Sequence, residues 1–410
     1  MAQASAESVS ISPARLERIG PAMQGYIDRG VYAGIRTLVA RRGVIVHDGV
    51  YGLRDKEAGL PMTQDAIFRL YSMTKPIVCT ALMTLYEEGR FRLIDPVARY
   101  IPAFAEVKVR EADGSLRTPK RPMMIRDVML HTSGLVYGFL AETQVGELYH
   151  DRKFADANVS LAEAIDDIAA LPLAFDPGAR WHYSVGIDVA ARLIEVISGQ
   201  KLADFLQERL FAPLGMADTG FTVPESKRSR LAAMYGRGDP FTPNRSLMQY
   251  FEDWRKGVND RVDVSKTYPV DAPDTFQRGG HGLFGTTADY FRFAQMLCNG
   301  GEFEGKRILS RKTIELMHGN HLPPSMLPLQ LDGLPTPGYG FGLGSRVALD
   351  VAATGKPGSV GEFGWAGAAK TYYWVDPVEK LVGVFMTQSL WSFDLPEQDL
   401  AAIAYGAIVD

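Results

Sequence analysis

The segment Ser72-Met73-Thr74-Lys75 sets a hydroxyl and an amine at a spacing that can do chemistry. Residues three apart on a helix share a face, so a helix beginning near Ser72 would place its hydroxyl beside the Lys75 amine. Pro76 fits such a helix only in the first turn, where its missing N–H is not needed. A serine with a basic neighbour at a helix N-terminus is typical of a nucleophile whose reaction passes through an oxyanion. A capping serine with a solvated lysine is the alternative interpretation.

A second candidate is the tyrosine in Trp181-His182-Tyr183-Ser184-Val185, which follows the turn Asp176-Pro177-Gly178 and precedes an apolar segment over 187–197. Tyr183 is either an anchor in the core or a phenol that transfers protons. A lysine ammonium nearby would favour the phenolate, because opposite charges attract. Such a phenolate can take the proton of a serine and later protonate the leaving group.

A third candidate is Gly364-Trp365-Ala366-Gly367-Ala368, which we expect to lead into a strand. A glycine before an edge strand lets the backbone approach a ligand closely. The backbone N–H of Ala368 is therefore expected to be an oxyanion donor beside that of Ser72. An ordinary turn is the alternative at this position.

Taken in order, Ser72-x-x-Lys75, Tyr183-Ser184-Val185 and Trp365-Ala366-Gly367 resemble the motifs of the serine β-lactamase and penicillin-binding-protein superfamily, in particular the class C β-lactamase-like carboxylesterases of family VIII. The resemblance covers roughly residues 10–405, with further similar blocks at 125–135, 175–178, 212–219 and 279–283. It implies that Ser72 forms an acyl-enzyme and that Lys75 and Tyr183 serve as base and acid, with their division of labour left open. It also implies an oxyanion hole made by the backbone N–H groups of Ser72 and Ala368, and chemistry without a metal or cofactor.

Two positions depart from the β-lactamase pattern. Val185 stands where those enzymes carry an asparagine that binds the side-chain amide of the lactam, and Trp365 stands where they carry a lysine that binds its carboxylate. Trp365 offers an apolar wall with a single donor, which suits an uncharged ester. We therefore expect a serine carboxylesterase for small to medium esters, with Trp365, Gly367 and Val185 in contact with the substrate. Acyl transfer to another acceptor, β-lactamase or D-Ala-D-Ala peptidase activity, and a non-catalytic binding protein are the alternatives.

The elements that would position these residues suggest an α+β fold of the β-lactamase/transpeptidase-like type. Strand patterns occur near 34–40 and 44–50, at 338–344, and as a hairpin over 368–375 and 381–386. Helices are expected from Ser12-Pro13 to about Ile27 and over 396–408. The economical arrangement is one antiparallel sheet built from residues 1–70 and 330–410 and flanked by the terminal helices, with a mostly helical domain over 71–329. The active site would lie at the seam.

Two aromatic-rich, loop-like stretches, 136–160 and 236–277, are expected to shape the acyl pocket or act as lids, with Tyr137 contacting the substrate. The segment Gly280–Gly285 matches Gly-x-Gly-x-x-Gly but lacks a surrounding βαβ pattern, so we interpret it as a loop closing on the active site. His318 and His321 are expected in a solvated loop rather than in a metal site.

The composition fits a globular enzyme: the chain has 410 residues, 46% of them hydrophobic, and a net charge of −4. This balance gives no reason to expect nucleic acid or an anionic membrane as a partner, so a small-molecule ester is the expected partner, and the oligomeric state is left open. Cys79 and Cys298 are expected to be reduced and packed, with one disulfide as the alternative. No secretory signal and no run of 18 apolar residues is visible in the sequence, so a cytoplasmic location is the expectation.

Overall fold

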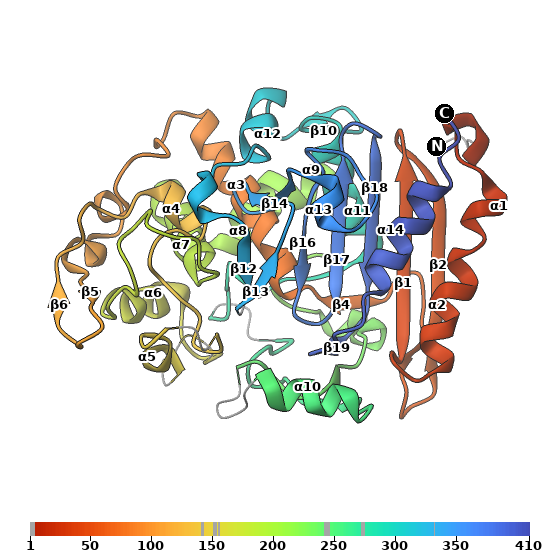
Figure 1. The fold of residues 1–410 in the computed structure, drawn as a ribbon, viewed down its shortest axis with the longest axis horizontal. Helices are drawn as coiled ribbons and strands as arrows, with labels where there is room; N and C mark the ends of the chain where they lie inside the picture. The colour runs from red at the N-terminus through yellow and green to blue at the C-terminus, as the bar shows by residue number, and fades with distance from the viewer. Residues whose placement is uncertain are drawn as a thin grey trace.

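The computed structural model describes residues 5–140, 143–150, 154, 156–241, 247–271, 275–331 and 333–410. Its centre is an antiparallel sheet of eight strands in the order β14-β15-β16-β17-β18-β1-β2-β3 (Figure 1). The strands are β1 (Gly34–Arg41), β2 (Val44–Asp55), β3 (Leu60–Pro61), β14 (Tyr339–Phe341), β15 (Arg346–Ala348), β16 (Phe363–Gly367), β17 (Thr371–Asp376) and β18 (Leu381–Met386).

The sheet joins the two ends of the chain, because β1 pairs with β18 in the register Thr37↔Phe385. This confirms the expected antiparallel sheet. One part of the pattern was misjudged: Gly364–Gly367 lies inside β16, a strand paired on both sides by β15 and β17, and does not precede an edge strand. Glycine and alanine are poor strand formers, and only the pairing on both sides reveals the strand.

One face of the sheet is covered by the terminal helices α1 (Pro13–Leu16), α2 (Ile19–Asp28) and α14 (Pro396–Gly406), as Figure 1 shows. The single helix expected from Ser12 to Ile27 is two helices, since α1 ends at Leu16 and α2 begins at Ile19. The apolar side chains of this layer form one cluster with the outer face of the sheet; its members include Ile19, Met23, Val39, Trp374, Phe385, Leu400 and Ala404.

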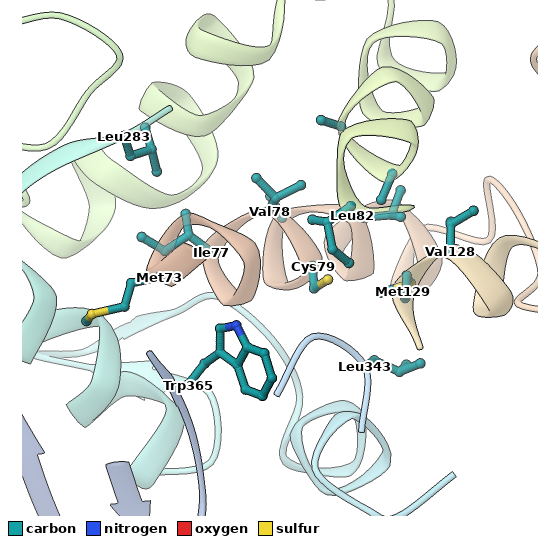
Figure 2. Close-up of a cluster of buried hydrophobic side chains, with 14 of the residues drawn as sticks. Met73, Ile77, Val78, Cys79, Leu82, Val128, Met129, Leu283, Leu343 and Trp365 are labelled. Atoms are coloured by element: carbon teal, nitrogen blue, oxygen red, sulfur yellow. The ribbon is translucent and has the colours of Figure 1, made fainter. Parts of the chain in front are cut away.

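The other face is covered by α11 (Thr287–Cys298), which packs on β1, β17 and β18, and by the elements around α3 (Thr74–Glu87). Every residue of α3 from Thr74 to Leu85 is buried, as expected of a helix that is apolar on all sides. Figure 2 shows its side chains, among them Ile77, Val78, Cys79 and Leu82, pointing toward the elements that enclose it. One of these elements is α7 (Gly186–Ser198), which packs in turn on α4 (Ile125–Met129).

The remaining helical elements are short and irregularly spaced: α5 (Gly146–His150), α6 (Leu161–Ala169), α8 (Leu202–Leu206), α9 (Ala212–Leu214), α10 (Leu247–Arg255), α12 (Arg311–Met317) and α13 (Val351–Thr354). Short strand pairs also occur between residues 60 and 340: β4 (Ile67–Arg69) with β9 (Phe284–Thr286), β5 (Val109–Arg110) with β6 (Leu116–Arg117), β7 (Tyr235–Gly236) with β8 (Asp260–Arg261), β10 (Glu302–Phe303) with β11 (Lys306–Arg307), and β12 (Leu329–Leu331) with β13 (Leu334–Thr336). A last strand, β19 (Ser389–Leu390), pairs with β7.

The division into two domains stays a prediction. Cys79 and Cys298 are free thiols. Within the described part of the chain, no helix combines the length and the apolar character needed to cross a membrane.

Candidate active site

Ser72 lies in a single 3-10 turn, Tyr71–Met73, that leads directly into α3. Pro76 is the third residue of α3, within the first turn as the sequence predicted. The turn begins at Tyr71, whose φ of 47° is in the left-handed region that non-glycine residues rarely adopt. Ser72 itself is half-buried, whereas Tyr71 and Met73 are buried. A strained residue of this kind is often found next to a reactive group.

Lys75 meets Ser72 from one turn further along and is only 1% exposed. Its Nζ donates to Ser72 Oγ at 3.0 Å and to the carbonyl oxygen of Gly280 at 2.7 Å. The same nitrogen lies 4.7 Å from the ring centroid of Tyr183 and 5.2 Å from that of Tyr137. An ammonium buried this deeply needs such partners, because losing its water shell is costly.

Tyr183 is held by aromatic and polar neighbours at the start of α7. Trp365 Nε1 donates to the phenolic oxygen of Tyr183 at 3.3 Å. The ring of His131 lies 4.7 Å from the Tyr183 ring, and its Nδ1 accepts the backbone N–H of Ser184 at 3.3 Å. Burial holds the pKa of His131 well below its usual range, and the Lys75 ammonium acts in the same direction. His131 is thus neutral and orients the loop.

The end of β16 lies against the backbone that precedes Ser72. A Cβ on Gly367 would overlap the carbonyl oxygen of Leu70 and the hydroxyl of Thr371, and so only glycine fits there. The Thr371 hydroxyl donates to the same Leu70 oxygen at 3.2 Å. Ala368, the next residue after β16, is exposed. Its N–H as an oxyanion donor stays a prediction.

The glycine-rich loop at 279–282 packs tightly on α7. A Cβ on Gly279 would lie 2.5 Å from Ala191 Cβ, and the Gly280 N–H donates to Asp188 Oδ1 at 2.8 Å. Close packing and the carbonyl that receives Lys75 therefore account for these glycines. This arrangement supports the interpretation of a loop that closes on the site.

Asp188 is a residue that the sequence analysis missed. Burial raises the pKa of its carboxyl to about 6, against the opposing effect of the Lys75 ammonium. The available signal was a carboxylate near the start of the apolar segment over 187–197.

Other predicted positions are placed as follows. Tyr137 is buried next to Lys75 and Tyr183, with its ring 5.4 Å from the Tyr183 ring. Val185 is 1% exposed at the start of α7, so its side chain is packed inside the protein. The expectation for His318 was wrong: it is buried at the end of α12 and stacks on Phe363 at 3.5 Å. Among the residues described, no group of three histidine, cysteine, aspartate or glutamate side chains could hold a metal ion.

A model of the β-lactamase family matches residues 20–407. The chain belongs to the β-lactamase family. It is 31% identical over 375 residues to the esterase EstB of Burkholderia gladioli, covering 87% of this chain and 86% of EstB. The expected family and its α+β fold are thereby confirmed, and the chain is a serine hydrolase of this family.

Two solved structures show the same fold over nearly the whole chain. EstCE1, described as a hydrolase with promiscuous acyltransferase activity, aligns with a TM-score of 0.78 at 25% identity, covering 96% of this chain and 99% of EstCE1. A family VIII carboxylesterase aligns with a TM-score of 0.72 at 19% identity, covering 97% and 98% of the two chains.

Proposed function

We propose that this protein is a carboxylesterase that cleaves small to medium esters through an acyl-enzyme on Ser72. The observation that carries the proposal is the convergence of three side chains: Lys75 Nζ lies 3.0 Å from Ser72 Oγ and over the ring of Tyr183. A nucleophile, a cation and a phenol at these distances are the groups that acyl transfer by serine requires.

In the proposed reaction, Ser72 Oγ attacks the carbonyl carbon of the ester while its proton passes to the Lys75–Tyr183 pair. The oxyanion that forms accepts hydrogen bonds from the N–H groups of Ser72 and Ala368. The carbon–oxygen bond to the alcohol then breaks, and the alkoxide takes the proton from the pair and leaves as the alcohol. Water then attacks the acyl carbon and gives a proton to the same pair. The bond from the acyl carbon to Ser72 Oγ breaks, Ser72 Oγ takes that proton back from the pair, and the acid leaves.

The ester preference is supported by Trp365. It is 8% exposed and donates to Tyr183, and so it brings no cation to the position where β-lactamases carry a lysine. A substrate carboxylate would lack its usual partner there, whereas an uncharged ester needs none. The similarity to the esterase EstB points the same way.

Transfer of the acyl group to an alcohol is a second candidate, because EstCE1 is described as having promiscuous acyltransferase activity. The acyl-enzyme is common to both reactions, and only the acceptor differs. Product analysis after adding an alcohol to the assay separates them: an ester of the added alcohol indicates transfer, and the free acid indicates hydrolysis.

The proposal is tested by assaying p-nitrophenyl butyrate and a chromogenic cephalosporin in parallel, with wild type and Ser72→Ala. We expect ester turnover far above cephalosporin turnover, and its loss in Ser72→Ala. Full esterase activity in Ser72→Ala would refute the nucleophile. Equal or faster cephalosporin turnover would assign the chain to the β-lactamase or peptidase class. A protein that neither turns over ester nor reacts with a p-nitrophenyl phosphonate would be a non-catalytic relative.

A further inference from the structure

The carboxylate of Asp188 is buried behind the proposed catalytic lysine and is only half satisfied. Asp188 is 0% exposed, and its Oδ1 accepts the Gly280 N–H at 2.8 Å. Its Oδ2 has no hydrogen-bond partner among the described residues. A buried carboxylate oxygen without a partner costs stability, and an apolar residue on α7 would avoid that cost. The presence of an acid at this position therefore calls for an explanation other than packing.

The backbone of Gly280 connects Asp188 to Lys75. Its N–H is bonded to Asp188, and its carbonyl oxygen accepts Lys75 Nζ at 2.7 Å. The two groups belong to successive peptide units that share the Gly280 Cα, so the hydrogen bond to Asp188 fixes the backbone at Gly280 and with it the direction in which its carbonyl points. The position of Lys75 thus depends on a backbone segment that Asp188 holds through the adjoining N–H.

The second carboxylate oxygen of Asp188, Oδ2, lies close to Gly280 and to the hydroxyl of Tyr137. A Cβ on Gly280 would lie 2.5 Å from Asp188 Oδ2 and 2.6 Å from the Tyr137 hydroxyl. The ring of Tyr137 in turn lies 5.2 Å from Lys75 Nζ. An aspartate, a tyrosine and a lysine from three different segments therefore converge on one glycine that has no room for a side chain.

Among the charged and titratable groups near Asp188 and Gly280, Lys75 is the cation whose position Asp188 can control. Arg278 also acts on Asp188, but its guanidinium donates to the carbonyl oxygens of Phe154 and Val159, and so it is held by the neighbouring loop. His131 and His281 face Lys75, and burial holds the pKa of each well below its usual range, so neither carries charge.

We propose that Asp188 is a positioning residue for acyl transfer, which holds the Gly280 backbone and supplies the negative charge that keeps Lys75 beside Ser72. This inference rests on the proposed function of Ser72 and Lys75. Asp188 does not touch the reacting atoms, since its contacts run through Gly280. Its role is to fix the location and the charge of Lys75, which contacts the proposed nucleophile.

The test is Asp188→Asn, which keeps the shape of the side chain and removes its charge. The rate of covalent labelling by a p-nitrophenyl phosphonate and kcat/KM for p-nitrophenyl butyrate are measured from pH 5 to 9. Removing a negative charge disfavours the protonated forms of the groups around it, so the acid limb of both profiles is expected to move to lower pH by about one unit or more. The maximal labelling rate is expected to fall roughly tenfold or more as Lys75 loses its fixed position.

Asp376→Asn is the matched control. Asp376 is also 0% exposed and also accepts backbone N–H groups, from Val378 and Glu379. It is the last residue of β17, whereas the first residue, Thr371, is the one that contacts the Ser72 turn through Leu70. We expect this variant to lower the melting temperature and to leave the acid limb unchanged. Equal shifts in the two variants would refute a specific role for Asp188.

If Asp188→Asn does not fold, Gly280→Ala tests the same arrangement with the charge retained, because its methyl group would push Asp188 Oδ2 and the Tyr137 hydroxyl away. A labelling rate at least tenfold below wild type is expected, and an unchanged rate would overturn the inference. Different results would refute the proposed function and the proposed role of Asp188. Activity in Ser72→Ala would refute the nucleophile, whereas a wild-type profile in Asp188→Asn, with Ser72 still labelled, would refute only the role of Asp188.

Discussion

Gly367→Ala is the substitution for which the structure yields the most explicit consequence. The new Cβ would overlap the Leu70 carbonyl oxygen and the Thr371 hydroxyl, although ordinary contacts begin near 3.4 Å. To reach an ordinary separation, the end of β16 must move away from the Ser72 turn by roughly 1 Å. Leu70 is backbone in a tight turn and cannot yield cheaply, so the strand end and the following Ala368 must take up the movement.

This displacement acts on the proposed oxyanion hole. In that proposed arrangement the N–H of Ala368 would move away from the N–H of Ser72, and loss of one such donor costs about 2.7–4 kcal/mol in the transition state, or 10²- to 10³-fold in kcat. We therefore expect kcat for p-nitrophenyl butyrate to fall by about two orders of magnitude in Gly367→Ala, with a much smaller change in KM, because the donor bonds the oxyanion more strongly than the ground-state carbonyl.

Gly34→Ala provides the matched control, since a Cβ there would overlap the backbone carbonyl oxygen of Leu53 to the same degree. Gly34 begins β1, three strands away from β16 in the sheet. Both variants should lose stability in thermal unfolding, but only Gly367→Ala should lose kcat at a temperature where both remain folded. A folded Gly367→Ala enzyme with wild-type kcat, or an equal loss of kcat in Gly34→Ala, would refute the reasoning.

Two further predictions concern neighbouring side chains. Trp365→Phe keeps the apolar wall but removes the Nε1 donor that bonds Tyr183 at 3.3 Å, so kcat for the ester should fall roughly tenfold, as expected for one hydrogen bond of about 1.4 kcal/mol; unchanged kcat and KM would show that this bond does not orient the phenol. Burial lowers the pKa of His318 from 6.5 to about 4. Between these two pH values the unfolded state binds a proton that the folded state does not bind, so the free energy of unfolding decreases as the pH falls from 6.5 toward 4. Between pH 7 and 5 this amounts to about 2 kcal/mol in urea unfolding, and the loss should be smaller in His318→Gln; an identical loss in both proteins would contradict the assignment.

The first motif of the proposed chemistry could be predicted from the sequence because its geometry is local. The spacing of Ser72 and Lys75 is one helical turn, and Pro76 limits where that helix begins, so their hydrogen bond follows from chain geometry alone. The strands β1, β2, β17 and β18 were also predictable, because their β-branched and aromatic content is typical of strands. Tyr183 and Trp365 were selected by motif and resemblance, and their contact across 182 residues is a fact of the tertiary structure.

Other features depend on neighbours distant in the sequence, and so they could not be predicted before the chain was folded. β16 is a strand because β15 and β17 pair with it, despite a composition that favours a turn. His318 is buried because Phe363 stacks on it from the sheet, although its own segment ends in two prolines. The fold class and the Ser72–Lys75 contact could be predicted from the sequence, since patterning and one helical turn suffice for those. The tertiary structure decided that Asp188, Gly280 and Tyr137 meet behind Lys75, because side chains from α7 and two loops become neighbours only when those segments pack together.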